Sequence, residues 1–174
     1  MRNISALLIL DAQVNMFDES FQIHRADEII STLSGLIEKA RSKDIPVIYL
    51  RNNGPAGEPD EPGTPGWEIH SSFAPKIDEV VIDKHTPDGF HETELKARLD
   101  ELGVGHLVIA GMQSEMCVET TVRKAVGLDY EVTLVKDGHS TFDFEDAKAV
   151  NTINRINDEL SSIANVVNSK EIDI

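Results

Sequence analysis

The sequence of 174 residues contains a single cysteine, Cys117. One cysteine cannot form an intrachain disulfide, and it excludes the cysteine clusters that hold structural zinc or iron–sulfur centres. A lone cysteine is either a small buried apolar residue or a nucleophile, and its surroundings must decide between the two. The six histidines show no spacing typical of metal ligands, so we expect no metal and no other cofactor.

Basic residues are scarce: 16 Lys and Arg stand against 31 Asp and Glu, which gives a formal net charge of −15. Such a surface repels phosphate backbones, so nucleic acid is not an expected partner. It weakly favours cationic ligands, although a solvated acidic surface without a specific role is the simpler interpretation. No apolar run approaches the roughly 20 residues that span a bilayer, and residues 1–10 lack the features of a secretory signal. We therefore expect a cytoplasmic protein that does not bind membranes.

Short apolar runs alternate with helical patterns along the whole chain. The runs predict strands at 6–10, 46–50, 80–83, 106–110 and 131–135, with a possible sixth at 166–167. Helical spacing predicts helices at 27–43, 93–102, 115–126 and 145–163, the first capped by Asp27. Continuous apolar strands between helices are typical of a parallel sheet covered on both faces. The sequence thus predicts one α/β domain spanning residues 1–174.

Residues 51–66 form the most conspicuous break in this alternation. The segment holds eight glycine and proline residues, so it predicts a long loop. Long loops inside compact domains are usually functional or disordered. We expect this loop to shape one side of a binding pocket.

Three reactive side chains follow predicted strands: Asp11 after the first, Lys84 after the third and Cys117 just beyond the fourth. Each residue alone also has an interpretation without a catalytic role. Asp11 could cap a turn, Lys84 could be a solvated charge at the end of a strand, and Cys117 could pack in the core. Ligands of open parallel sheets, however, bind outside the carboxyl ends of the strands. Together, the start of a helix and a lysine would lower the pKa of the Cys117 thiol, and an aspartate could then move protons. Nucleophile, cation and carboxylate form a set suited to acyl transfer.

Five segments resemble motifs of the isochorismatase-like hydrolase superfamily. Residues 6–17, ALLILDAQVNMF, resemble its LLVIDMQNDFF opening, and residues 66–70, GWEIH, resemble its GxEIH segment. Residues 80–84, VVIDK, are similar to its VVxK strand, and residues 111–121, GMQSEMCVETT, to its GxxTxxCVxxT cysteine motif. Residues 137–140, DGHS, correspond to its DAxxS turn after strand five. The segments occur in the family's order.

This resemblance implies a three-layer α/β/α Rossmann-like sandwich around a six-stranded parallel sheet. It implies a catalytic triad in which Cys117 attacks a carbonyl carbon and forms a covalent acyl-enzyme. Asp11 would act as the general acid and base, and Lys84 would stabilise the thiolate. The family also has a cis peptide bond, here Met112–Gln113, and an oxyanion hole, here the backbone amides of Gln113 and Cys117.

The departures from the family pattern narrow the implied activity. The loop and the segment that follows it, up to His70, lack the Asp-x-His pair with which nicotinamidases of this superfamily hold a metal. Isochorismatases that cleave a vinyl ether do not need a thiol, so retention of Cys117 points to a C–N bond of an amide or carbamoyl group. The cysteine motif is most similar to the amidase branch, which includes proteins resembling streptothricin hydrolase. A vinyl-ether hydrolase and a non-hydrolytic redox or ligand-binding domain remain the alternatives.

The remaining expectations concern the substrate and the assembly. The substrate is a small molecule, and the resemblance implies a homodimer or a higher homo-oligomer. Six residues flank the motif segments and are expected as pocket walls, with core packing or loop anchoring as the alternative for each: Gln13, Phe17, Trp67, His70, Thr86 and Phe90.

Overall fold

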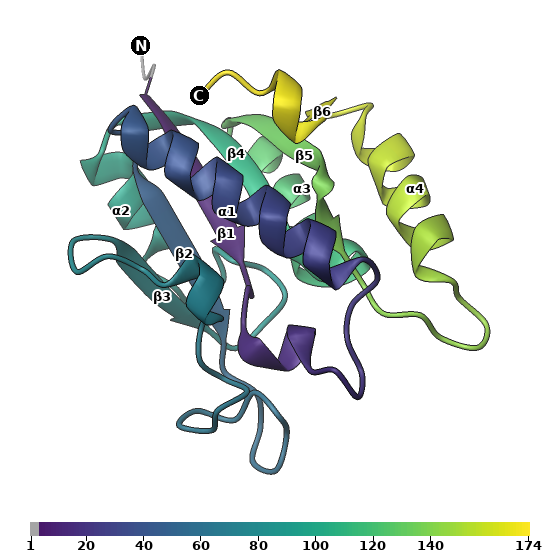
Figure 1. Ribbon diagram of the computed structural model, residues 1–174. Coiled ribbons are helices and arrows are strands. Elements are labelled where there is room, and N and C mark those ends of the chain that lie inside the picture. Colours follow the sequence, from purple (N-terminus) through teal and green to yellow (C-terminus); the bar gives the residue numbers. More distant parts are fainter. Residues whose placement is uncertain (1–3) are drawn as a thin grey trace.

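Six parallel strands form the middle layer of the protein (Figure 1). The computed structural model describes residues 4–174, so residues 1–3 of the segment searched for a secretory signal lie outside the described part. Long apolar runs become strands here because helices cover both faces of the sheet. The order across the sheet is β3-β2-β1-β4-β5-β6, with bounds β1 Ile4–Leu10, β2 Val47–Asn52, β3 Val80–Lys84, β4 Val104–Met112, β5 Glu131–Ser140 and β6 Asn165–Val167.

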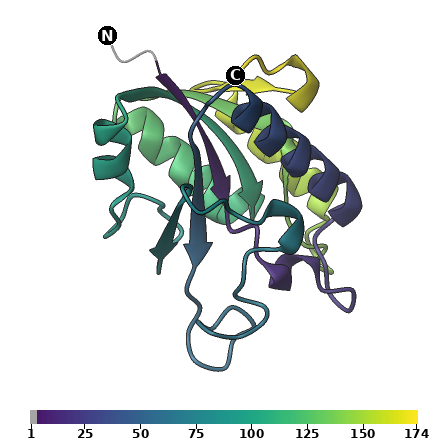
Figure 2. The same cartoon turned by 60° about the vertical axis from the view of Figure 1, so that its left-hand side comes forward.

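The helices divide between the two faces of this sheet (Figure 2). One face packs against α1 (Ala26–Ser42), and the other packs against α2 (Leu95–Glu101), α3 (Glu119–Gly127) and α4 (Ala149–Leu160). Successive residues of a strand point to opposite faces, so β1 supplies Leu7 and Ile9 to the α1 side and Leu8 and Leu10 to the other. The predicted three-layer α/β fold with its six-stranded parallel sheet is confirmed.

Three local expectations are wrong. Asp27 is not the cap of α1 but lies in its first turn, where its charge suits the helix dipole; the capping position is Arg25. The last helix begins at Ala149, not at residue 145. The Asp143 carboxylate accepts a hydrogen bond from the Ala149 amide, which is one of the free amides at the start of this helix. Residues 137–140 lie inside β5, since its pairing with β4 shifts and then resumes with His139 opposite Gly111.

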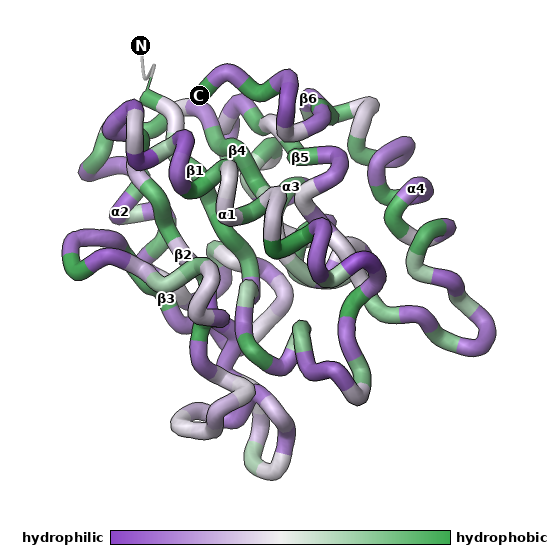
Figure 3. Tube along the Cα trace, viewed as in Figure 1, coloured by the Kyte–Doolittle hydropathy of each residue, from purple (hydrophilic) through white to green (hydrophobic). Residues whose placement is uncertain are grey.

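The connection between β2 and β3 projects beyond the carboxyl ends of the strands (Figures 1 and 2). Figure 3 shows it as largely hydrophilic, in contrast to the hydrophobic strands. Its backbone is held internally, because the Gly54 amide donates to Asp60 O over 2.9 Å and Thr64 Oγ1 donates to Pro59 O over 2.8 Å. The connection is therefore an ordered structure at the edge where ligands of such sheets bind. None of the helices within residues 4–174 is long and apolar enough to cross a membrane.

Candidate active site

Asp11, Lys84 and Cys117 meet beyond the carboxyl ends of the strands. Lys84 Nζ lies 2.9 Å from Asp11 Oδ2 and 3.1 Å from Cys117 Sγ. Asp11 follows β1, Lys84 ends β3, and Cys117 lies in a π-helical segment, Ser114–Val118, that leads into α3. All three are buried, with exposed fractions of 1% for Asp11, 0% for Lys84 and 9% for Cys117. The structure thus brings together the three side chains that the sequence singles out.

The backbone beside Asp11 allows an unusually close approach of β1 and β4. Asp11 has φ +47°, in the left-handed region that few residues other than glycine adopt. Gly111, paired with Leu10, has φ +129°, and a Cβ there would lie 2.1 Å from Leu10 O. Only glycine fits this position, and the nearby Met112–Gln113 peptide bond is cis, at the place that the family resemblance implies.

Lys84 is held by the end of β2 as well as by its two charged partners. Its Nζ also donates to Asn52 Oδ1 and to Thr86 O, each over 3.3 Å. Asn52 is fixed in turn by Gln13, whose side chain accepts from Asn52 N over 2.8 Å and donates to Asn52 O and Trp67 O over 3.0 Å. The Gln13 side chain therefore joins the end of β2 to the connection between β2 and β3 through hydrogen bonds.

Burial is the largest single influence on the pKa of each of the three groups. Burial and, after it, the negative charge of Asp11 raise the pKa of the Cys117 thiol to about 12 against the opposing effect of Lys84. Burial also raises the pKa of Asp11, partly offset by Lys84. Burial would lower the pKa of Lys84, but its contacts with Asp11 and Cys117 keep that pKa above its ordinary value.

The expectation that the pKa of Cys117 is lowered is therefore wrong. Desolvation of the sulfur and the charge of Asp11 outweigh the nearby ammonium group of Lys84, so the thiol is protonated at neutral pH in the resting protein. A thiolate must then form by proton transfer to a neighbour. Asp11 suits this role, because its buried Oδ1 has no hydrogen-bond partner within the described residues.

A cavity of about 380 Å³ leads to this cluster. Its size lies at the small end of the range for sites that bind small molecules. The loop after β2, the segment after β3 and the start of the cysteine segment all contribute to its walls. The lining residues are Asp11, Asn15, Met16, Asn52, Glu58, Pro59, Asp60, His85, Thr86, Pro87, Gln113, Met116, Cys117 and Phe142.

Of the six residues expected as pocket walls, Thr86 lines this cavity, and the other five are not among its described lining residues. Phe17 and His70 pack together, with ring centroids 5.0 Å apart. Trp67 donates to Asn53 Oδ1 over 2.7 Å, and Phe90 stacks on Tyr130 at 5.9 Å. These contacts fit the alternative interpretation of loop anchoring and packing.

The sequence interpretation missed several cavity residues. Asp60 and Glu58 lie in the Gly- and Pro-rich loop, which was expected to shape the pocket, but no motif marked these two carboxylates. Phe142 follows β5, two residues after the 137–140 segment that resembles a family motif, but it is not among the expected pocket walls.

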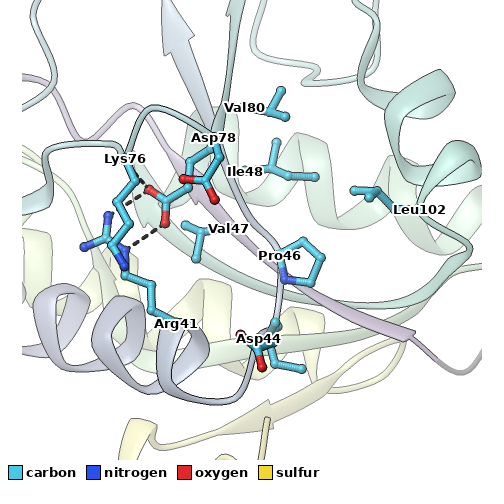
Figure 4. Close-up of a pocket in the computed structure, with 11 residues that line it drawn as sticks. Arg41, Asp44, Pro46, Val47, Ile48, Lys76, Asp78, Val80 and Leu102 are labelled. Atoms are coloured by element: carbon cyan, nitrogen blue, oxygen red, sulfur yellow. Dashed lines mark hydrogen bonds and ion pairs between the residues drawn. The ribbon is translucent and has the colours of Figure 1, made fainter.

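A second cavity, of about 350 Å³, lies at the other end of the sheet, beside the amino ends of β2 and β3 (Figure 4). Its walls include Arg41, whose Nη2 pairs with Glu79 Oε2 at 2.7 Å, and the side chains of Pro46, Val47 and Leu102. No cysteine, serine or histidine is among its described lining residues. Among residues 4–174, no three His, Cys, Asp or Glu side chains are grouped to hold a metal ion.

A buried hydrogen-bonded chain supports the segment that carries Cys117. His139 Nδ1 lies 2.8 Å from Ser114 Oγ, and His139 Nε2 lies 3.0 Å from Asn157 Oδ1. Asn157 Nδ2 donates to Lys136 O, so its Oδ1 accepts from His139 Nε2, which leaves Nδ1 of a neutral His139 to accept from the Ser114 hydroxyl. Burial lowers the pKa of His139 and therefore favours this neutral form.

This arrangement predicts a specific loss of stability in acid. The pKa of folded His139 lies below its value of about 6.5 in an unfolded chain, so the unfolded state binds the proton first. The stability from neutral His139 is present above pH 6.5 and falls as the pH drops below it. The loss is about 1.4 kcal/mol for each pH unit over which only the unfolded chain is protonated. Urea unfolding at pH 7 and pH 5 measures it, and His139→Gln should show the smaller difference; equal differences would contradict this assignment.

Comparisons with known proteins place this architecture in a family. The model of the isochorismatase domain matches residues 5–168. A streptothricin hydrolase of Streptomyces noursei is 39% identical over 140 residues, which are 80% of this chain and 51% of that protein. The chain thus spans about half the length of this curated relative. The ureidoacrylate amidohydrolase RutB of Caulobacter vibrioides is 27% identical over 146 residues, 67% of this chain and 65% of that protein.

A solved structure agrees with the sequence comparison. The crystal structure of an isochorismatase from Pseudomonas putida KT2440 superposes with a TM-score of 0.91 at 28% identity, covering 99% of this chain and 91% of that one. The predicted resemblance, including that to the amidase branch, is confirmed. A family model that covers nearly the whole chain and a relative 39% identical over most of it show that the protein belongs to the isochorismatase family of hydrolases.

Proposed function

We propose that the protein hydrolyses a C–N bond in an amide or carbamoyl group of a small molecule, through a covalent acyl intermediate on Cys117. The observation that carries this proposal is the position of Cys117 Sγ, which lines the cavity and lies 3.1 Å from an ammonium group paired with a buried carboxylate. Two relatives are named as a streptothricin hydrolase and an amidohydrolase, which supports amide hydrolysis.

In the first half of the reaction, Asp11 takes the proton of the Cys117 thiol as the sulfur attacks the carbonyl carbon. Since the thiol has a pKa of about 12, free thiolate is scarce, and proton transfer must accompany the attack. Lys84 stabilises the negative charge on the sulfur. Protonated Asp11 then donates its proton to the leaving nitrogen, the C–N bond breaks and an amine departs from the thioester.

In the second half, water enters and Asp11 removes its proton as the oxygen attacks the thioester carbon. The C–S bond breaks, the acid leaves and the proton returns to the sulfur. One water is consumed for each amide converted to an acid and an amine. Because the pKa of Lys84 lies above its ordinary value, Lys84 remains an ammonium group throughout the cycle.

The backbone amides of Gln113 and Cys117 are the proposed donors to the oxyanion that forms during both attacks. Gln113 lines the cavity beside the sulfur. The Gln113 carbonyl accepts from the amides of Met116 and Val118, each over 3.1 Å, which holds the segment between the two donors in one shape. Loss of one such donor typically lowers kcat by a factor of about 10² to 10³.

The charge of the cavity argues against the vinyl-ether alternative. Isochorismate carries two carboxylates, whereas the described lining includes Glu58 and Asp60 but no lysine or arginine. A redox sensor is also disfavoured, since peroxide reacts with exposed thiolates and the Cys117 thiol is buried with a raised pKa. We propose that the enzyme lies in the cytoplasm, a compartment in which a single unpaired cysteine is common.

The test is a panel of small primary amides, N-carbamoyl compounds and isochorismate, with release of ammonia, amine or pyruvate followed for each. We expect turnover of members of the first two classes and none of isochorismate. Turnover of isochorismate alone would overturn the proposal.

A further inference from the structure

We propose that the substrate amide carries a positively charged nitrogen, which is recognised by the carboxylates of Asp60 and Glu58. This inference rests on the proposed function and names the substrate class for the same site. It is carried by the charge of the cavity, by the way Asp60 is held and by the neutral groups beside it.

The cavity has an unbalanced negative charge. Its described lining contains three carboxylates, Asp11, Glu58 and Asp60, and neither lysine nor arginine. The positive charge of buried Lys84 balances the negative charge of Asp11, with Lys84 Nζ 2.9 Å from Asp11 Oδ2. Within residues 4–174, Glu58 and Asp60 form no ion pair, and both residues line the space that a substrate would fill. A cation in this cavity is attracted, and an anion is repelled.

The side chain that positions Asp60 also contacts Lys84, one of the three proposed catalytic residues. Asn52 Nδ2 donates to Asp60 Oδ2 over 2.7 Å, while Asn52 Oδ1 accepts from Lys84 Nζ over 3.3 Å. A Cβ at Gly54 would lie 1.9 Å from Asp60 Oδ1, so the glycine leaves the room that the carboxylate occupies. Asn52 thus links Asp60 to Lys84, which places the carboxylate close to the scissile bond. Its charge also reaches Asp11, whose pKa it helps to raise.

The neutral walls of the cavity add groups that suit a cation. Asn15 lines the cavity, and its Oδ1, which is shielded from solvent, has no hydrogen-bond partner within the described residues. Phe142 lines the cavity and stacks on Phe21, with ring centroids 4.6 Å apart and planes 3° from parallel. An aromatic face is a favourable neighbour of a positive charge.

Three probe amides of nearly equal length separate charge from size: 4-aminobutyramide is a cation, pentanamide is neutral and glutaramate is an anion. For the wild-type enzyme we expect kcat/KM to be at least about tenfold higher for 4-aminobutyramide than for pentanamide, and lowest for glutaramate. Asp60→Asn keeps an oxygen that can accept from Asn52 but removes the charge. It should lower kcat/KM for 4-aminobutyramide by about tenfold more than kcat/KM for pentanamide, since any effect of the lost charge on Asp11 is shared by both substrates.

Glu68→Gln is the matched control, because Glu68 is an exposed carboxylate that is not among the lining residues of the cavity. It should alter kcat/KM for neither amide. Equal rates for the cationic and neutral amides, or an equal loss of both in Asp60→Asn, would overturn the inference and leave the proposed function intact. Hydrolysis of other amides but none of these three would also overturn it, whereas a complete lack of amide hydrolysis would overturn the proposed function itself.

Discussion

Replacing Cys117 with alanine is expected to lower kcat for amide hydrolysis by at least about 10⁴-fold while the protein stays folded. The substitution removes the one atom that can form the thioester, and no second cysteine can replace it. Lys84 keeps its contacts with Asp11, Asn52 and Thr86, so its ammonium group remains paired. Steady-state kinetics measure the loss, and thermal unfolding followed by circular dichroism checks the fold.

Cys117→Ser is the companion variant, because it replaces the sulfur with a smaller oxygen whose proton is harder to remove. It should be nearly as inactive as the alanine variant, since a buried hydroxyl has an even higher pKa than the thiol. A Cys117→Ala enzyme that keeps most of its activity would show that bond cleavage needs no thiol, as in vinyl-ether hydrolysis.

Asp11→Asn should lower kcat/KM by a factor of about 10² to 10⁴, the usual contribution of a positioned general acid and base. The asparagine has the same shape but cannot take the thiol proton or protonate the leaving nitrogen. It also removes the charge that raises the pKa of Lys84, so that pKa should fall. Kinetic assays with one amide and one carbamoyl substrate measure the loss, and an active Asp11→Asn enzyme would exclude Asp11 as the base.

The pH profile gives a second measure of the role of Asp11. Only the carboxylate form accepts a proton, so kcat/KM should rise with pH through the pKa of Asp11, which burial holds above its ordinary value of 3.8. Lys84 stays charged because its pKa lies above 10.5, so we expect a plateau that begins above the pKa of Asp11 and extends to about pH 10. Activity that instead rose through the pKa of about 8.5 of a free thiol would indicate a pre-formed thiolate.

Much of the fold could be predicted because its causes are local. Runs such as Ala6 to Leu10 are apolar at every position, and only a strand covered on both faces accommodates that pattern at this length. The convergence of Asp11 and Lys84 follows, since the carboxyl ends of parallel strands share one edge of the sheet. The start of α4 was misplaced because a hydrogen bond from Ala149 to Asp143 decides it, and helical spacing does not report such a bond.

The chemistry of the site is harder to predict from the sequence, because it depends on contacts between segments that are far apart along the chain. The pKa of Cys117 depends on how completely the surrounding protein excludes water from the sulfur. Phe17 and His70 end recognised motif segments but pack against each other, whereas Asp60 and Phe142 reach the cavity from positions outside those segments. The motifs therefore predict part of the pocket, including Thr86 and Cys117, but not the contribution of Asp60.

The most direct test of the covalent mechanism is the partition of the acyl group between water and hydroxylamine. Two amides that share one acyl group but release different amines are hydrolysed in the same concentration of hydroxylamine, and the acid and hydroxamate are quantified. A common thioester on Cys117 predicts the same ratio of acid to hydroxamate from both amides. A ratio that changes with the leaving amine would contradict an acyl-enzyme intermediate.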